Sequence, residues 1–243
     1  MSTRLLIDAG NTRLKWVRMG EQDWQAQGWI DYSDWSAFVV ALAGVSRCFV
    51  ACVAGAAHRQ RLAEVLAEAG VDVIWLRSEA AYGDLVNGYA VPEQLGVDRW
   101  MALIAARART SEPLLVVSAG TAMTVDAISA AGRFLGGIIV PGVQLMREAL
   151  RQGTAGVEPA EGHVEAFPRG TSDAVHSGIV AALCGAVRRQ FEALAAHAGQ
   201  VPRCIVTGGD AAVIAPHLDW PVEIVPALVL EGIERMANQE GAS

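Results

Sequence analysis

The residues with the clearest chemical potential form a short segment near the N-terminus. Residues 8–15 read Asp-Ala-Gly-Asn-Thr-Arg-Leu-Lys and follow the apolar run 5–7. A carboxylate at a strand end can hold Mg²⁺ through water, because Mg²⁺ prefers oxygen ligands and keeps much of its hydration. Gly10 lets backbone N–H groups approach a phosphate, and Lys15 faces the same site if the next strand alternates. The segment is either a phosphate-binding turn or an ordinary hairpin capped by Asp8.

Two later turns of small residues repeat this arrangement. Residues 118–126 read Ser-Ala-Gly-Thr-Ala-Met-Thr-Val-Asp after the apolar run 114–117, and residues 207–210 read Thr-Gly-Gly-Asp after the run 203–206. Glycine at a strand end permits close approach of a flat or anionic ligand to the backbone. Each turn is a weak signal alone, whereas three of them at strand ends favour a nucleotide or polyphosphate site.

A fourth segment, residues 96–99, reads Gly-Val-Asp-Arg at the expected start of a helix. An aspartate at that position is usually an N-cap. Alternatively, Asp98 is a general base for an alcohol and Arg99 holds an anion through its planar guanidinium. The sequence leaves both interpretations open at this point.

Strands and helices must position these segments, and the hydrophobic pattern predicts two similar series of them. The first series has strands at 5–7, 14–17, 25–30, 47–54 and 71–76, and helices at 33–42, 57–69 and 98–110. The second has strands at 114–117, 123–128, 133–140, 203–206 and 222–225, and helices at 144–151, 172–198, shortly after 210, and from 227. Residues 81–94 and 153–170 are expected to be irregular. The Ala-Gly pairs at 9–10 and 119–120 are offset by 110 residues, which indicates a duplication into domains 1–112 and 113–243.

The composition narrows the class of protein. The 243 residues carry a net charge of −7, which disfavours nonspecific binding to nucleic acid or to an anionic membrane surface. We expect no signal peptide, no membrane span, reduced core cysteines and a cytoplasmic location. Lys15 is the single lysine among 19 cationic residues and does not follow glycine, so a standard Walker A loop is excluded.

Five motifs, taken together, resemble those of type III pantothenate kinase. They are D-x-G-N-T-x-x-K, L-G-x-D-R, G-T-A-x-T-x-D, G-G-x-I-x-P-G and T-G-G-D-A, in this order between residues 8 and 211. That family belongs to the superfamily of acetate and sugar kinases, Hsp70 and actin. The resemblance implies an α/β architecture with a duplicated ribonuclease-H-like (actin-like ATPase) fold, in which two similar domains enclose an interdomain nucleotide cleft.

The resemblance also implies an activity and a set of site residues. ATP would phosphorylate the primary hydroxyl of pantothenate, the first step of coenzyme A biosynthesis, and the catalytic Asp98 would accept the hydroxyl proton. The residues implied in binding ATP phosphates are Asp8, Ala9, Gly10, Asn11, Thr12, Arg13, Leu14, Lys15 and Thr121. The residues implied in binding pantothenate are Tyr89, Gly96, Val97, Asp98, Arg99 and Thr171.

The implied cofactors and partners follow from the same resemblance. Mg²⁺ would lie near Asp8, with water mediating the contact. Family members are homodimers in which the partner subunit completes the pantothenate pocket. Many carry aspartate where this chain has Ser118, and that aspartate is associated with K⁺ or NH₄⁺. Serine lacks the charge, so the monovalent cation either binds differently here or is dispensable.

Two other readings of the sequence remain open. A sugar-type kinase of the same superfamily would share the phosphate turns and differ around Tyr89 and residues 96–99. A non-catalytic actin-like or Hsp70-like binding or regulatory protein would keep the fold without needing a base at the acceptor site. The joint presence of Asp8, Asp98 and Thr121 favours the enzyme.

Overall fold

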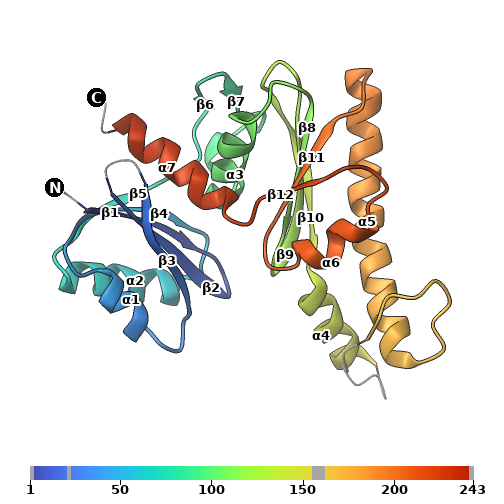
Figure 1. Cartoon of the computed structure of the whole chain (residues 1–243), viewed down its shortest axis with the longest axis horizontal. Coiled ribbons are helices and arrows are strands. Elements are labelled where there is room, and N and C mark those ends of the chain that lie inside the picture. The colour runs from blue at the N-terminus through green and yellow to red at the C-terminus, as the bar shows by residue number, and fades with distance from the viewer. Residues whose placement is uncertain (1–2, 21–22, 155–161, 241–243) are drawn as a thin grey trace. The chain divides into compact units, whose positions relative to one another are not determined.

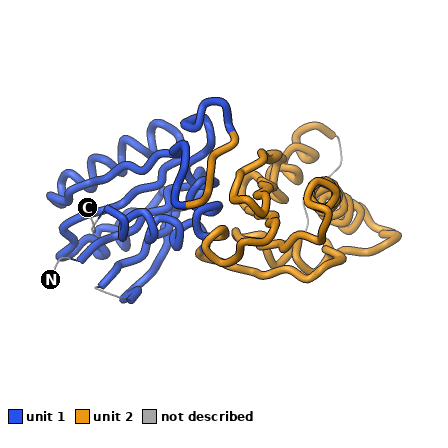
Figure 2. The backbone as a smooth tube through the Cα atoms, turned by 90° about the horizontal axis from the view of Figure 1, so that it is seen from above, with its two compact units in different colours: residues 1–83, 89–105, 228–243 blue, residues 84–88, 106–227 orange. Residues whose placement is uncertain are grey.

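The computed structural model describes residues 3–20, 23–154 and 162–240, which divide into two compact units (Figure 2). Unit 1 contains residues 1–83, 89–105 and 228–243, and unit 2 contains residues 84–88 and 106–227. These units differ from the expected ranges 1–112 and 113–243 chiefly at the C-terminus. The last helix belongs with the N-terminal residues, because it packs on strands of unit 1 through its buried side.

Unit 1 is built on a five-stranded mixed sheet with the strand order β3-β2-β1-β4-β5. The strands β1, β2 and β3 are antiparallel, whereas β4 and β5 continue from β1 in parallel. The strands are β1 (Thr3–Ala9), β2 (Arg13–Met19), β3 (Trp24–Asp31), β4 (Val45–Cys52) and β5 (Asp72–Trp75). The main helices are α1 (Ser36–Ala41), α2 (Ala56–Glu68), α3 (Val97–Arg107) and α7 (Leu228–Glu240).

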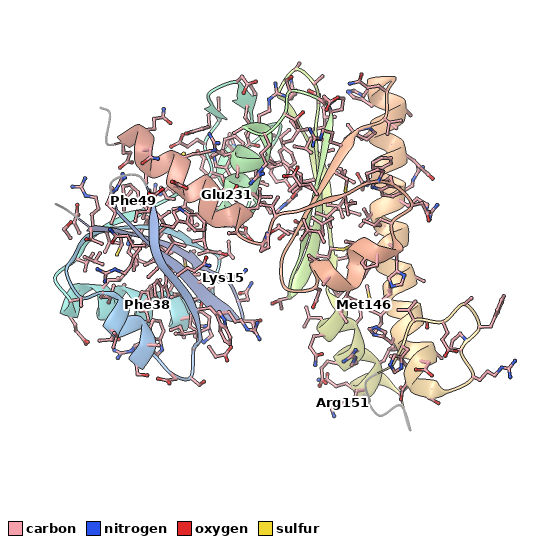
Figure 3. All side chains as sticks on the ribbon, in the orientation of Figure 1. Lys15, Phe38, Phe49, Met146, Arg151 and Glu231 are labelled. Atoms are coloured by element: carbon pink, nitrogen blue, oxygen red, sulfur yellow. The ribbon has the colours of Figure 1, made fainter. Side chains whose placement is uncertain are left out.

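Along β1, alternate side chains face the apolar core of unit 1 and the opposite face of the sheet. Leu5 and Ile7 are buried in the same apolar cluster as residues of α1 and α2, including Phe38. Successive side chains on a strand point to opposite faces of the sheet, so Asp8 points to the other face. Phe49 of β4 lies on that other face as well, because it pairs in register with Leu6 (Figure 3).

Unit 2 repeats the topology of unit 1, with the strand order β10-β9-β8-β11-β12 (Figure 1). Its strands are β8 (Leu114–Ala119), β9 (Ala122–Ile128), β10 (Phe134–Pro141), β11 (Arg203–Thr207) and β12 (Glu223–Ile224). The strands β8, β9 and β10 are antiparallel, and β8, β11 and β12 are parallel. The first strands of the two sheets end at Ala9 and Ala119, so the predicted duplication is confirmed.

One long helix covers the apolar face of the unit 2 sheet. The helices of this unit are α4 (Val143–Gly153), α5 (Thr171–Ala198) and α6 (Ala211–Ile214), followed by the 3-10 helix η2 (Ala215–His217). Leu183 and Val187 of α5 are buried against Val117 of β8 and Val125 of β9. The helix ends where Gly199 adopts a left-handed conformation with φ of 67°, which glycine accepts without a steric penalty.

The predicted elements agree with the structure except in their ends and in one connection. The stretch expected to be irregular at 81–94 contains two short strands, β6 (Ala81–Tyr82) and β7 (Leu85–Val86), and the 3-10 helix η1 (Pro92–Gln94). Part of the stretch expected to be irregular at 153–170 lies outside the described residues. Over the described part of the chain, no helix combines the length and hydropathy needed to cross a bilayer.

Candidate functional site

The Gly10 turn connects β1 to β2 and is defined by backbone hydrogen bonds. The N–H of Gly10 donates to the carbonyl oxygen of Arg13 over 3.1 Å. The carbonyl oxygen of Ala9 accepts from the N–H groups of Val53 and Ala54 over 3.0 and 3.1 Å. Asn11 is exposed at the tip of this turn. The turn is therefore a hairpin fixed by backbone hydrogen bonds, with an exposed tip.

Asp8 and Lys15 lie directly opposite each other across β1 and β2. Residues directly opposite in an antiparallel pair have side chains on the same face, so the predicted alternation that brings Lys15 to the side of Asp8 is confirmed. Burial raises the pKa of the Asp8 carboxyl to about 6, while Lys15 lowers it and Asp98 raises it further. The Asp8 carboxylate is thus poorly solvated and gains from any nearby cation. Figure 3 labels Lys15 on its strand.

Asp98 lies in the first turn of α3 with its carboxylate folded back on the helix start. Its Oδ1 atom accepts a hydrogen bond from the backbone N–H of Arg99 over 2.8 Å. Burial raises the pKa of Asp98, and the Arg99 backbone N–H and guanidinium lower it in part. Asp98 also raises the pKa of Asp8, because a second negative charge disfavours the ionised form. A carboxylate whose pKa is raised is a stronger base than an ordinary aspartate.

Gly96 leaves room for the Asp98 carboxylate. A Cβ atom at Gly96 would lie 2.7 Å from Oδ1 of Asp98, closer than real Cβ contacts allow. The segment before it is fixed by Ser78, which is buried and donates to the carbonyl oxygen of Leu95 over 2.7 Å. The predicted Gly-Val-Asp-Arg segment therefore owes its conformation to glycine and to a serine that no motif indicated. Val97 is buried beside it.

Arg99 and Tyr89 form a pair next to this helix start. An Nη atom of Arg99 donates to the hydroxyl oxygen of Tyr89 over 3.1 Å, and the guanidinium carbon lies 5.8 Å from the ring centroid. The Arg99 residue is only 6% exposed. The pairing holds a desolvated guanidinium in one orientation, which suits recognition of a carboxylate.

Unit 2 carries the equivalent turn between β8 and β9. The N–H of Gly120 donates to the carbonyl oxygen of Ala122 over 3.2 Å, and the carbonyl oxygen of Thr121 accepts from the N–H of Gly142 over 2.9 Å. A Cβ atom at Gly142 would overlap the carbonyl oxygens of Gly120 and Thr121. The last position of the motif G-G-x-I-x-P-G must therefore be glycine, because a larger residue would not fit against this turn.

The third turn packs on the same strand end. Gly208 has a φ of +100°, and a Cβ atom there would overlap the carbonyl group of Ala119. The N–H of Asp210 donates to the carbonyl oxygen of Ala119 over 3.0 Å. The turns after β8 and β11 therefore lie together at one edge of the unit 2 sheet, as expected for parallel strands.

Ser118 lies in a small polar group on β8 and β9. It is directly opposite Thr124, whose hydroxyl donates to Oδ2 of Asp126 over 3.2 Å. Asp126 is 2% exposed. Asp126 thus provides a carboxylate on β9, two residues beyond the partner of Ser118, whereas Ser118 itself is uncharged.

Thr171 is the first residue of α5, behind Gly170. The N–H of His163 donates to Oδ1 of Asp173 over 2.8 Å, and the N–H of Glu165 donates to the hydroxyl of Ser177 over 3.0 Å. These bonds fix the segment before α5 against the first turns of the helix. The other predicted ATP-binding and pantothenate-binding residues lie in unit 1, whereas Thr121 and Thr171 belong to unit 2.

Sequence reasoning missed one residue that contacts the Gly10 turn. The Tyr32 hydroxyl donates to the carbonyl oxygen of Gly10 over 2.6 Å. The tyrosine lies 22 residues further along the chain, after the third strand, and belongs to none of the motifs. The pairing of β3 with β2 brings it back to the turn. Only the strand order, which the sequence pattern does not provide, could have indicated it.

The residues around Asp8 fit a hydrated divalent cation. Among the described residues, no group of three or more His, Cys, Asp or Glu side chains is arranged to bind a metal ion directly. Asp8 and Asp98 are nevertheless two poorly solvated carboxylates that act on each other electrostatically. That donor set suits Mg²⁺, which keeps several waters and needs only one or two carboxylates.

The duplicated sheets and their turns define a class of protein. The chain has the fold of MreB5 of Spiroplasma citri, solved bound to ADP, with a TM-score of 0.53 at 12% identity over 99% of this chain and 97% of that one. A Campylobacter jejuni structure described as a Baf family transcriptional activator is closer, with a TM-score of 0.69 at 20% identity over 98% and 100% of the two chains. The architecture is therefore that of the actin-like ATPases.

Sequence comparison then identifies the family. The family model of type III pantothenate kinase matches residues 4–207. A type III pantothenate kinase of Thiobacillus denitrificans is 56% identical over 238 residues, which cover 98% of each chain. The chain belongs to the type III pantothenate kinase family, which is a family of kinases.

Proposed function

We propose that this protein transfers the γ-phosphoryl group of ATP to the primary hydroxyl of pantothenate, the first step of coenzyme A biosynthesis. The observation that carries the proposal is the pairing of Asp8 with Lys15 across β1 and β2 next to the Gly10 turn, in the unit that also contains Asp98. The proposed base for the acceptor hydroxyl thus belongs to the same unit as the groups suited to phosphate. Membership of the family supports pantothenate as the acceptor.

On the phosphate side, the proposal assigns ATP binding to residues 8–15 and to Thr121. The turn N–H groups and Lys15 offset the charge that develops on the phosphoryl oxygens, and phosphoryl transfer depends mainly on such positioning and neutralisation. Mg²⁺, when bound, supplies further charge neutralisation. Asp8 would hold that ion through water, with Lys15 preserving the carboxylate in its ionised form.

On the acceptor side, the proposal assigns proton acceptance to Asp98. Its raised pKa strengthens it as a base for an alcohol, and such a base contributes roughly 10²–10⁴ in rate. Arg99 would bind the pantothenate carboxylate with Tyr89 holding the guanidinium in place. Gly96, Val97 and Thr171 complete the proposed acceptor contacts.

The remaining parts of the proposal concern cations and assembly. We expect the activity to depend on K⁺ or NH₄⁺ only if the polar group of Ser118, Thr124 and Asp126 binds the cation in place of an aspartate at position 118. Comparing K⁺, NH₄⁺ and Na⁺ salts at equal ionic strength measures this directly. The proposal includes a cytoplasmic homodimer whose partner subunit completes the pantothenate pocket, which light scattering coupled to gel filtration would test.

The experiment that tests the function measures ADP release by the purified protein with ATP, Mg²⁺ and K⁺. Pantothenate is expected to stimulate it, and 4′-phosphopantothenate is expected to appear in equal amount by mass spectrometry. A panel of sugars serves as the comparison, because a sugar-type kinase is the alternative enzyme. Stimulation by a sugar alone would reject the proposed acceptor, and no stimulation by any acceptor would favour a nucleotide-binding regulatory protein.

A further inference from the structure

Tyr32 contacts the Gly10 turn from outside every motif of the chain. It follows β3 directly, and its hydroxyl donates to the carbonyl oxygen of Gly10 over 2.6 Å. Its ring stacks on that of His58 from α2, with centroids 3.9 Å apart and planes 8° from parallel. The hydroxyl therefore reaches the turn from a ring that a second residue holds in place.

This hydrogen bond controls the direction of a backbone donor. The carbonyl oxygen of Gly10 and the N–H of Asn11 belong to the same peptide group, which is planar and trans, so they point in opposite directions. Fixing the Gly10 oxygen toward Tyr32 consequently turns the Asn11 N–H to the opposite side of the turn. A phosphate bound by the turn meets a donor whose direction is already set.

Besides the backbone hydrogen bonds of the hairpin, a second side-chain contact beside the turn is weaker than that of Tyr32. The Nε atom of Arg13 lies 3.5 Å from Oδ1 of Asp31, and both side chains are more than half exposed. The Arg13 guanidinium also lies 4.6 Å from a ring centroid of Trp29. Exposed ion pairs contribute little to conformational stability. Tyr32 is better placed to fix the turn, because its bond is short and partly buried.

We propose that Tyr32, held by its stack on His58, is a positioning residue that orients the Gly10 turn for binding the phosphates of ATP. This inference rests on the proposed function of the turn. It assigns to Tyr32 no contact with the nucleotide and no part in proton transfer. Its effect should therefore appear in affinity for phosphates and not in the chemistry of the acceptor.

The test is the variant Tyr32→Phe, which removes the hydroxyl and keeps the ring. We expect its affinity for ATP, measured by titration calorimetry with Mg²⁺, to fall about three- to tenfold, the usual effect of losing one hydrogen bond. The loss should be smaller for AMP, which carries one phosphate. The KM for ATP should rise by the same factor as the dissociation constant, while the KM for pantothenate stays unchanged.

Tyr82→Phe is the matched control. The Tyr82 hydroxyl donates to the backbone carbonyl oxygen of Arg235 over 3.0 Å, so the substitution removes the same kind of bond in the same unit. Its affinities for ATP and AMP should equal those of the parent. A purely structural role of Tyr32 predicts equal losses of ATP and AMP affinity, and that result would overturn the proposal, as would unchanged ATP affinity.

Two variants of His58 provide an independent arm if Tyr32→Phe does not fold. His58→Phe keeps an aromatic partner for the stack and should bind ATP like the parent. His58→Ala should lower the affinity for ATP more than the affinity for AMP. Equal ATP affinity of the two variants would contradict the proposal. Because these measurements need no acceptor, they decide the role of Tyr32 even if pantothenate fails to stimulate ADP release.

Discussion

Asp8 and Lys15 are directly opposite neighbours on β1 and β2, and they are held in register by the six residue pairs that join these strands. The ammonium of Lys15 lowers the pKa of a carboxyl that burial raises to about 6. The single lysine of the chain therefore has two effects at the proposed phosphate site. It supplies a cation, and it helps to keep Asp8 ionised.

Replacing Lys15 with methionine should impair ATP use without unfolding the protein. Loss of a charged hydrogen-bond donor to a phosphate typically costs about 1.5–3 kcal/mol, so kcat/KM for ATP should fall about 10- to 150-fold. Lys15→Arg keeps the charge and should recover part of the loss. Steady-state kinetics with melting curves measures both effects, and parental kinetics of Lys15→Met would remove Lys15 from the phosphate site.

Replacing Asp98 with asparagine should separate binding from turnover. Asparagine keeps the size of the side chain but cannot accept the hydroxyl proton, so kcat should fall roughly 10²- to 10⁴-fold while the affinity for ATP changes little. Single-turnover kinetics and calorimetry distinguish the two quantities. A kcat near that of the parent would show that the acceptor hydroxyl needs no base.

Asp8 should give the activity an acid limit. Its pKa of about 6 in the free protein means that the carboxylate is ionised above that pH and neutral well below it, so kcat/KM should decline as the pH falls through about 6. Asp98 acts on the same carboxylate, and the observed limit belongs to the pair. Lys15→Met should move the limit to higher pH. A profile that stays flat down to pH 5 would exclude an ionised Asp8 as a requirement.

The same shift predicts a stability effect of the opposite sign. Because folding raises the pKa of Asp8 from 3.8 to about 6, the folded state favours the neutral form, and the ionised form is penalised at higher pH. Asp8→Asn should therefore stabilise the ligand-free protein at pH 8, by at most about 3 kcal/mol, and give little gain near pH 4. Melting temperatures at the two pH values measure it, and an equal change at both would contradict the role of burial.

Replacing Gly96 with alanine should disturb catalysis through Asp98. The added Cβ atom would press on Oδ1 of Asp98 and turn the carboxylate away from its position on the helix start. We expect kcat to fall at least tenfold, since displacement of a catalytic group by about 1 Å can cost roughly 10²-fold. Gly185→Ala is the control, because a Cβ atom there meets no other atom within 4 Å. Equal kcat values for the two variants would argue against the contact.

The sequence predicted the fold well where apolar runs and glycine turns stand close together. The strand before Asp8 and the offset of 110 residues between Ala9 and Ala119 were enough to indicate two similar sheets. Contacts between distant segments could not be predicted this way. Neither Tyr32 at the Gly10 turn nor Ser78 behind Leu95 shows a local pattern, because strand pairing and loop packing bring them there.

The domain border shows the same limit. The helical pattern after residue 227 predicts α7 correctly but contains no information about which sheet it covers. Gly232 shows that α7 packs against α3, since a Cβ atom at Gly232 would overlap the backbone of Met101. This close approach assigns α7 to unit 1, whereas the sequence pattern alone assigns it to the expected domain 113–243.

The position of α7 has a consequence for folding during synthesis. Unit 2 is nearly continuous along the chain, but unit 1 needs residues 228–243 as well as the first strands. Domains generally fold as units once their residues have been made. The sheet that carries Asp8 and the Gly10 turn therefore keeps one face uncovered until α7 has been synthesised. A nascent chain that stops before residue 228 should fold unit 2 and leave unit 1 incomplete.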